Sequence, residues 1–309
     1  MRIFSVVAGM VLMTGLASPA QANMKDDCLQ SNSQDLRISG CTAVIDSGQW
    51  QGKNLAWAYI NRGRAYRVID ESSLALEDFD QALNFDPDSF QAYMNRGSVH
   101  SYMALYSRAV EDYNEALRLD PMSVAALSNR GNAYSSIGKH LRAIEDFDHA
   151  LKLNPDHMFT YNNRGSAYTH LGEHRRAIED YNEALQRDPS YASARFNRGN
   201  DHNRLAWALY LEGRTAEALI DVEQALLDRP GYAAAHDTRA HVLAAFGRSA
   251  EALTEFESAM DAGKAKFVRI YQEALAEHGF YDGAINGVYD ADVRAALVTC
   301  LEADCRVLE

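Results

Sequence analysis

The chain has 309 residues, with 43 acidic against 30 basic side chains and a formal net charge of −13. This length is typical of about two domains, and the acidic balance argues against a protein that binds the phosphate backbone of nucleic acids. Apolar residues make up 47% of the chain, which is enough for a packed core and argues against global disorder.

Residues 1–22 have the layout of a secretory signal peptide. A single arginine, Arg2, precedes an uncharged apolar run, which is followed by Pro19 and by small residues up to Ala22. This order predicts export with cleavage after Ala22. The alternative is an uncleaved anchor, but the run is short for a bilayer span. We therefore expect a periplasmic or otherwise exported protein with no membrane span after signal cleavage.

All four cysteines follow this segment and fall into two local pairs, Cys28 with Cys41 and Cys300 with Cys305. In an oxidising compartment an even number of cysteines favours disulfides, and this pairing closes the shortest loops of the three possible pairings. The alternative is that Cys41 is only a core residue, because it takes a position where the helical repeats described below carry an aromatic residue. Neither pair has the spacing of a tetrahedral zinc site. No metal and no cofactor are expected.

The prolines mark an internal repeat. Pro87, Pro121, Pro155 and Pro189 are 34 residues apart, and the next interval, to Pro230, is 41. Because proline ends helices, this fixed spacing predicts a repeated helical element of two helices joined by a short turn. The seven extra residues amount to two helical turns, so the first helix of that repeat can lengthen while keeping its inward face.

The repeated positions resemble the tetratricopeptide repeat family. Four repeats match it nearly completely, at residues 56–89, 90–123, 124–157 and 158–191. Counted within each repeat, they share an aromatic residue or leucine at position 4, glycine at 8, alanine at 20 and 27, and proline at 32.

The resemblance implies an all-α fold, a right-handed superhelical solenoid of about five to six helix hairpins. A partial repeat or cap is expected at residues 23–55 and extended, degenerate repeats at 192–266. A small helical segment is expected at 267–309.

In this family the first helix of each repeat lines a concave groove, so the groove positions bear on function. Position 6 is an asparagine in five consecutive repeats: Asn61, Asn95, Asn129, Asn163 and Asn197. Asparagine both donates and accepts hydrogen bonds, so such a ladder can pair with the backbone of an extended peptide. The alternative is that each asparagine only satisfies a neighbouring helix. The cations of the family's carboxylate clamp are missing from positions 2 and 5, so an acidic C-terminal peptide is not the expected ligand.

Position 7 is an arginine in the same repeats, and an aspartate recurs in the second helix. The arginines are Arg62, Arg96, Arg130, Arg164 and Arg198, and the matching aspartates are Asp78, Asp112, Asp146, Asp180 and Asp221. One interpretation is an anion-binding stripe. The interpretation we favour is an ion pair between the two helices of each repeat, because position 7 normally points between them.

Residues 268–302 resemble the peptidoglycan-binding-like domain, a small three-helix module. The resemblance rests on two helices around a glycine-rich turn that contains Gly279-Phe280-Tyr281 and Ile285-Asn286-Gly287. The third helix is missing, and Asn286 stands where aspartate is usual. The resemblance implies Tyr281, Asn286 and Tyr289 as candidate glycan-binding residues. The competing interpretation is that the two helices only cap the array of repeats and are held by a disulfide between Cys300 and Cys305.

No residue set that breaks the repeat pattern indicates catalysis. His170 and His174 have the spacing of metal ligands on a helix, but a glycine turn separates them, so we interpret them as solvated turn histidines. We expect a non-enzymatic scaffold that binds a protein or extended peptide in its groove, in the periplasm or cell envelope of a bacterium. The second hypothesis is an envelope protein anchored to peptidoglycan by its C-terminal segment.

Overall fold

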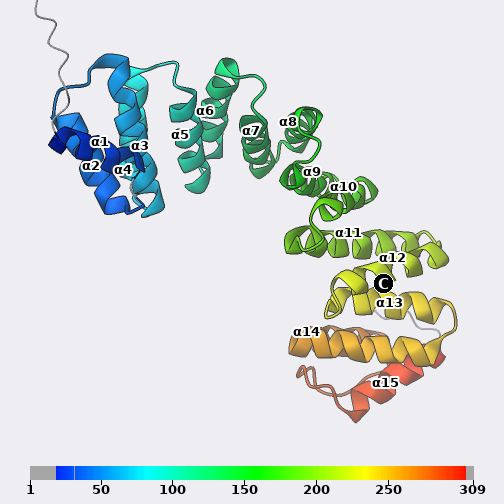
Figure 1. Ribbon diagram of the computed structural model, residues 1–309. Helices are drawn as coiled ribbons and strands as arrows, with labels where there is room; N and C mark the ends of the chain where they lie inside the picture. Colours follow the sequence, from blue (N-terminus) through cyan, green and yellow to red (C-terminus); the bar gives the residue numbers. More distant parts are fainter. Residues whose placement is uncertain (1–18, 31, 304–309) are drawn as a thin grey trace, which may run out of the picture. The chain divides into compact units, whose positions relative to one another are not determined.

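The computed structural model describes residues 19–30 and 32–303, with only the backbone for residues 19–22. Within these residues the fold is all-helical and contains no strand (Figure 1), which confirms the predicted fold class. None of the described helices combines the length and the hydrophobicity needed to cross a bilayer.

The helices form two compact blocks, and the boundary between them falls inside α7, after Ala133. The N-terminal block contains α1 Pro19–Gln30, α2 Gln34–Asp46, the short 3₁₀ helix η1 Gly52–Leu55, α3 Ala56–Val68, α4 Ser72–Phe85, α5 Phe90–Tyr102, α6 Tyr106–Leu119 and most of α7 Val124–Ser136. The C-terminal block contains α8 His140–Leu153, α9 Met158–His170, α10 His174–Arg187, α11 Ala192–Leu211, α12 Thr215–Asp228, α13 Ala233–Ala245, α14 Ser249–Glu277 and α15 Ala291–Glu302.

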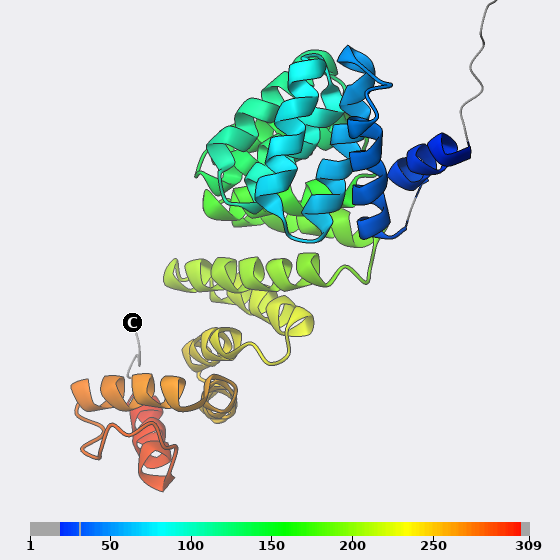
Figure 2. The same ribbon diagram turned by 90° about the vertical axis from the view of Figure 1, so that its left-hand side faces the viewer.

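Within each block, consecutive helices pair as hairpins that stack on one another. In the N-terminal block α3 pairs with α4 and α5 with α6, and the first helices α1, α3 and α5 contact in sequence. In the C-terminal block α11 lies beside α12 and α13 beside α14 (Figures 1 and 2), and the first helices α9, α11 and α13 contact in the same way. The first helices of each block therefore share one side of the stack.

A glycine–aromatic contact explains how closely the two helices of a hairpin approach. A Cβ atom added to Gly63 would lie 2.8 Å from a ring carbon of Phe79, and one added to Gly165 would lie 2.8 Å from a ring carbon of Tyr181. Both rings are fully buried. Position 8 must therefore be glycine, because the ring in the second helix fills the space that any side chain would occupy.

The extra seven residues lengthen the first helix of the fifth repeat, as the sequence predicts. Helix α11 has 20 residues, whereas the corresponding helix α9 has 13. Gly199 consequently no longer faces an aromatic ring and instead approaches Arg229 and Asp228. The two added turns thus change which residues of α12 lie opposite the first half of α11.

A disulfide joins α1 to α2 at the start of the described chain. Cys28 and Cys41 are bonded, with their Cα atoms 4.5 Å apart, and both are fully buried beside Val44 and Leu55. The first predicted pairing is therefore confirmed, and Cys41 is a core residue as well. Residues 1–18 of the predicted signal peptide and Cys305 lie outside the described residues. The predicted cleavage site after Ala22 falls in α1.

The C-terminal segment packs as a continuation of the last repeat. Helix α14 runs through the expected boundary near residue 266 and bends at Lys264, which has a positive φ of 56°. Phe256 before the bend shares one core with Tyr271 after it and with Leu297 and Cys300 of α15. The predicted helices of the tail are thus present and are joined to the sixth repeat through a common core.

Gly165→Ala is expected to lower the urea midpoint of unfolding, at a cost of about 1–3 kcal/mol, because the added methyl group overlaps the Tyr181 ring. Urea unfolding followed by circular dichroism measures the change. The matched control is Gly231→Ala, where nothing lies within 4 Å of the added carbon, and its effect should stay within about 0.5 kcal/mol. Equal effects of the two substitutions would contradict the packing role of position 8.

Candidate functional site

The five predicted ladder asparagines all lie on the first helix of a hairpin, and each is half-buried. Asn61 is on α3, Asn95 on α5 and Asn129 on α7 of the N-terminal block, and Asn163 is on α9 and Asn197 on α11 of the C-terminal block. Each asparagine therefore occupies the position that the repeat predicts within its own hairpin, although the hydrogen bonds of these side chains differ between the two blocks.

In the N-terminal block the ladder asparagines bond only within their own helix. The Nδ2 atom of Asn61 donates to the Trp57 carbonyl at 2.9 Å, and that of Asn95 donates to the Gln91 carbonyl at 2.7 Å. Among the described residues, the Oδ1 atoms of Asn61 and Asn95 accept no hydrogen bond, and Asn129 makes none at all. These asparagines do not satisfy a neighbouring helix, and their acceptor oxygens remain available to a ligand.

In the C-terminal block a buried asparagine links two members of the ladder. Asn197 Nδ2 donates to Asn162 Oδ1 at 3.2 Å, and Asn162 Nδ2 lies 3.3 Å from Asn163 Oδ1. In this block the asparagines do partly satisfy a neighbouring helix, because these side chains join α9 to α11. Asn162 was missed at the level of sequence, although the doublet Asn162-Asn163 occurs only in this repeat and could have indicated it.

The position-7 arginines form ion pairs inside the fold. Arg164 contacts Asp180 through two hydrogen bonds of 2.6 and 2.8 Å, and the Asp180 side chain is only 5% exposed. Arg164 also reaches back to Asp148 of the preceding hairpin at 2.6 Å. Burial disfavours the charged guanidinium, but the hydrogen bonds and charges of both aspartates outweigh it and raise the pKa of Arg164. The favoured ion-pair interpretation is confirmed here, and the arginine additionally ties consecutive hairpins together.

In the other repeats the arginine also contacts the preceding hairpin, where it meets a threonine, an aspartate or an asparagine. Arg62 binds Asp78 and Thr42, Arg96 binds Asp112 and Asp80, Arg130 contacts Asn114, and Arg198 contacts Asn182. This bridge between repeats was not predicted, because it depends on how adjacent hairpins are stacked.

The expected pairing of Arg198 with Asp221 is wrong. Arg198 binds Asp228, with contacts of 2.6 and 2.8 Å, and Asp221 instead lies 2.8 Å from Nδ1 of His202. The two extra turns of α11 place Arg198 seven residues further from the turn between the helices. The opposing residue of α12 is therefore also seven residues further along the chain.

Of the two turn histidines, His170 is exposed as expected, whereas His174 is half-buried and paired, which corrects its interpretation as a solvated residue. His174 Nδ1 lies 2.6 Å from the buried carboxylate of Asp201, and His170 stacks on His140 with ring centroids 4.7 Å apart. His170 and His174 thus contact different residues. The described part of the chain contains no group of three or more residues that could hold a metal ion.

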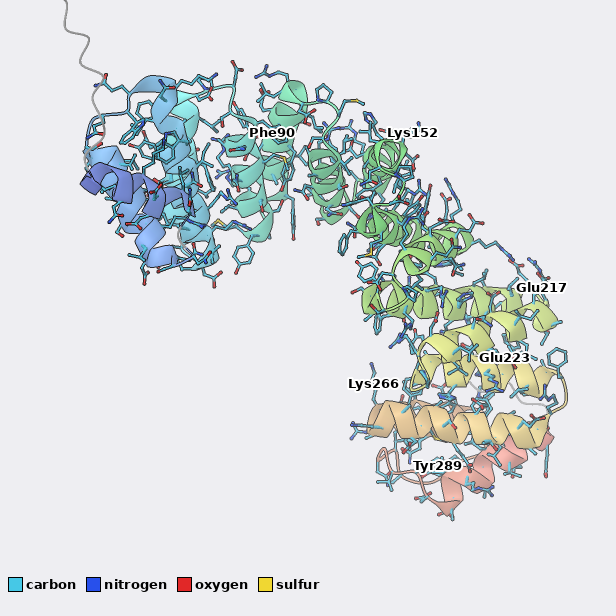
Figure 3. The ribbon with its side chains drawn as sticks, viewed as in Figure 1. Phe90, Lys152, Glu217, Glu223, Lys266 and Tyr289 are labelled. Carbon is cyan, nitrogen blue, oxygen red and sulfur yellow. A yellow bond between two sulfur atoms is a disulfide. The ribbon has the colours of Figure 1, made fainter. Side chains whose placement is uncertain are left out.

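The polar groups of the candidate glycan-binding residues have structural partners within the tail. The hydroxyl of buried Tyr281 lies 3.4 Å from Nε2 of Gln272, and that of Tyr289 donates to Glu257 at 2.8 Å. Asn286 Oδ1 accepts from the same Gln272 nitrogen at 3.0 Å. These contacts fix the loop between α14 and α15, where Figure 3 labels Tyr289. A glycan-binding role for them stays a prediction.

A pocket of about 430 Å³ lies between α11, the helix that has the extra turns, and α13, the first helix of the next repeat. It is lined by Asn203, Arg204 and Trp207 from α11 and by Ala234, Asp237 and Thr238 from α13. The irregular proline interval indicated this repeat as the exception. The individual residues were missed, because their convergence depends on the contact between two first helices.

Comparisons with known proteins support the repeat assignment. Models described as tetratricopeptide repeat match residues 90–121, 124–157 and 159–191, and a model described as TPR repeat matches residues 106–138. A search of curated proteins finds no match. The matched residues confirm that the chain carries tetratricopeptide repeats.

Solved structures show the same fold at low sequence identity. YrrB, described as a TPR protein with an unusual peptide-binding site, is 22% identical with a TM-score of 0.53, over 64% of this chain and 96% of that one. A tetratricopeptide repeat protein from Parabacteroides merdae is 17% identical with a TM-score of 0.54, over 92% and 98%. A MamA fragment from Desulfovibrio magneticus is 19% identical with a TM-score of 0.51, over 56% and 95%.

Asp180→Asn is expected to lower the free energy of unfolding by about 2–4 kcal/mol, because it weakens a buried, doubly bonded partner of Arg164. The matched control is Asp156→Asn, whose side chain is 92% exposed and lies 3.7 Å from Arg187, and its cost should stay below about 1 kcal/mol. Urea unfolding of both variants provides the comparison. A similar small cost for both would favour an anion-binding role over a structural one.

Proposed function

We propose that this chain, which carries tetratricopeptide repeats, is a non-enzymatic scaffold that binds a protein partner through an extended peptide segment. Within each block, a peptide segment lies along the first helices and pairs with the ladder asparagines of that block. The proposal assigns no chemistry to the chain.

The observation that carries the proposal is the state of the position-6 side chains in the N-terminal block. Asn61, Asn95 and Asn129 are half-buried, lie on successive first helices, and have acceptor oxygens without partners among the described residues. The bonds from Asn61 and Asn95 to their own helices hold these side chains in place before a ligand arrives. A row of pre-positioned acceptors suits the N–H groups of an extended backbone.

The charges on the first helices favour recognition of the backbone over recognition of an acidic ligand. Arg62, Arg96 and Arg164 are neutralised by aspartates inside the fold. Position 2 carries Trp57, Gln91, Ala125 and Phe159, none of which is a cation. The peptide-binding site named in the description of YrrB supports a peptide ligand for this fold.

We further propose that the scaffold acts after export, in the periplasm or cell envelope. The layout of residues 1–22 supports secretion, and the disulfide between Cys28 and Cys41 is of the kind that persists in an oxidising compartment. The peptidoglycan-anchor hypothesis has no comparable support, because the polar groups of Tyr281, Asn286 and Tyr289 are used within the tail.

Substitution of Asn95, Asn129 and Asn163 together by alanine tests the ladder. Peptides are first selected from a displayed random library on the full chain, and their affinity is then measured by fluorescence anisotropy. Loss of about three hydrogen bonds should weaken binding about 100-fold, while circular dichroism remains unchanged.

The matched control replaces three exposed glutamates of the second helices, Glu111, Glu145 and Glu179, by alanine. Its affinity should stay within about threefold of the parent. Full affinity in the asparagine variant, or a similar loss in both variants, would reject the ladder as the binding surface.

A further inference from the structure

We propose that the pocket between α11 and α13 takes an arginine side chain of the bound peptide, which would give the scaffold sequence specificity. This inference rests on the proposed peptide-binding function. The regular repeats offer contacts to any backbone, whereas this pocket lies between the repeat that has the two extra turns and the repeat that follows it.

The pocket depends on the length of α11. Trp207 lies beyond the point where a 13-residue helix starting at Ala192 would end. Asn203 and Trp207 are four residues apart and therefore share one face of α11. Asp237 and Thr238 face them from α13, whose Thr238 occupies the ladder position of its own repeat. The pocket thus continues the ligand-binding side of the first helices.

Asn203 supplies a buried acceptor that lacks a donor. Its side chain is only 7% exposed, and among the described residues its Oδ1 atom has no hydrogen-bond partner. A buried acceptor without a partner destabilises the fold. The oxygen is shielded from solvent in this conformation, and a turn of the amide group would bring it to the pocket, where a ligand donor could satisfy it. A peptide side chain with several N–H groups meets this requirement.

Asp237 supplies a second acceptor, and this one carries charge. Its Oδ1 atom accepts a hydrogen bond from Tyr271 and lies 3.6 Å from Nε2 of His241. These contacts fix the carboxylate, while its Oδ2 atom has no partner among the described residues. A cationic ligand group would be held by this oxygen and by the amide oxygen of Asn203 together.

Trp207 supplies an aromatic wall. Its ring lies 5.4 Å from the ring of Tyr210 and 5.5 Å from that of His241, which together set its orientation. A guanidinium group can stack on such a ring and bond both acceptors with its fork of N–H groups, which a lysine ammonium cannot do equally well.

Arg204 lies at the exposed rim of the same pocket and has no ion pair among the described residues. Its N–H groups can donate to a backbone carbonyl of the same peptide. An acidic side chain in the pocket would meet the carboxylate of Asp237 and would bring no donor for Asn203, so arginine is the better match.

A double-mutant cycle on the full chain tests the pocket. Peptides selected from the random library should be enriched in arginine at one position. In the selected peptide that arginine is replaced by citrulline, its neutral analogue, and in the protein Asp237 is replaced by asparagine, which can still accept from Tyr271. Each single change should weaken binding about tenfold, and the pair should show a coupling of about fivefold or more.

Two further variants separate binding from structure. Glu223→Gln makes the same charge change on α12, where Figure 3 labels this exposed residue, and should alter affinity less than about twofold. Asn203→Leu removes the unpaired acceptor, so it should raise the urea midpoint while weakening the arginine peptide. A lowered midpoint with unchanged affinity would assign Asn203 a structural role.

The outcomes distinguish this inference from the function on which it rests. The pocket assignment is rejected if the captured peptides show no arginine enrichment. It is also rejected if the double-mutant cycle shows no coupling between Asp237→Asn and citrulline. Either result leaves the ladder assignment intact. If no peptide is captured, the proposed function fails, and N-acetylarginine amide is titrated while the Trp207 indole signal is followed by NMR. A shift of that signal, absent with N-acetylcitrulline amide, supports the pocket, and no shift overturns it.

Discussion

The contact between the position-8 glycine of a first helix and the aromatic ring of the second helix fixes how closely the two helices of a regular hairpin approach. It brings Gly63 against Phe79 and Gly165 against Tyr181. Successive residues of a helix are turned by about 100° from one another. With glycine directed at the partner helix, the arginine before it points between hairpins and the asparagine before that stays half-exposed. The tripeptide Asn-Arg-Gly therefore combines a packing, a bridging and a ligand-facing position in three consecutive residues.

Features that depend on local spacing in the chain could be predicted from the sequence. The hairpins, the lengthened α11 and the Cys28–Cys41 disulfide are all local in the chain, so spacing was sufficient to predict them. Contacts that depend on the axial position of one helix against another were not predicted. Arg198 pairs with Asp228 because α11 is longer, and Asn162 joins α9 to α11 because these helices touch. The pocket at Asn203 and Asp237 belongs to the same class.

The asparagine ladder and the pocket between α11 and α13 would contribute differently to ligand recognition. A ladder of amides bonds any extended backbone, and it provides affinity without regard to side chains. The pocket beside Trp207 depends on the two extra turns of α11, which the regular first helices lack. It provides the carboxylate of Asp237, the amide oxygen of Asn203 and the indole ring of Trp207 for one basic side chain. Specificity would thus come from the single departure from the 34-residue period.

Side-chain amide NMR of the full chain with a selected peptide shows whether the ligand lies on the asparagine ladder. If a peptide binds there, the NH₂ signals of Asn95, Asn129 and Asn163 shift on binding. The signals of Asn114 and Asn182, which lie on second helices and bond to Arg130 and Arg198, should stay in place. Shifts at Asn114 and Asn182 with none at the three ladder asparagines would contradict it.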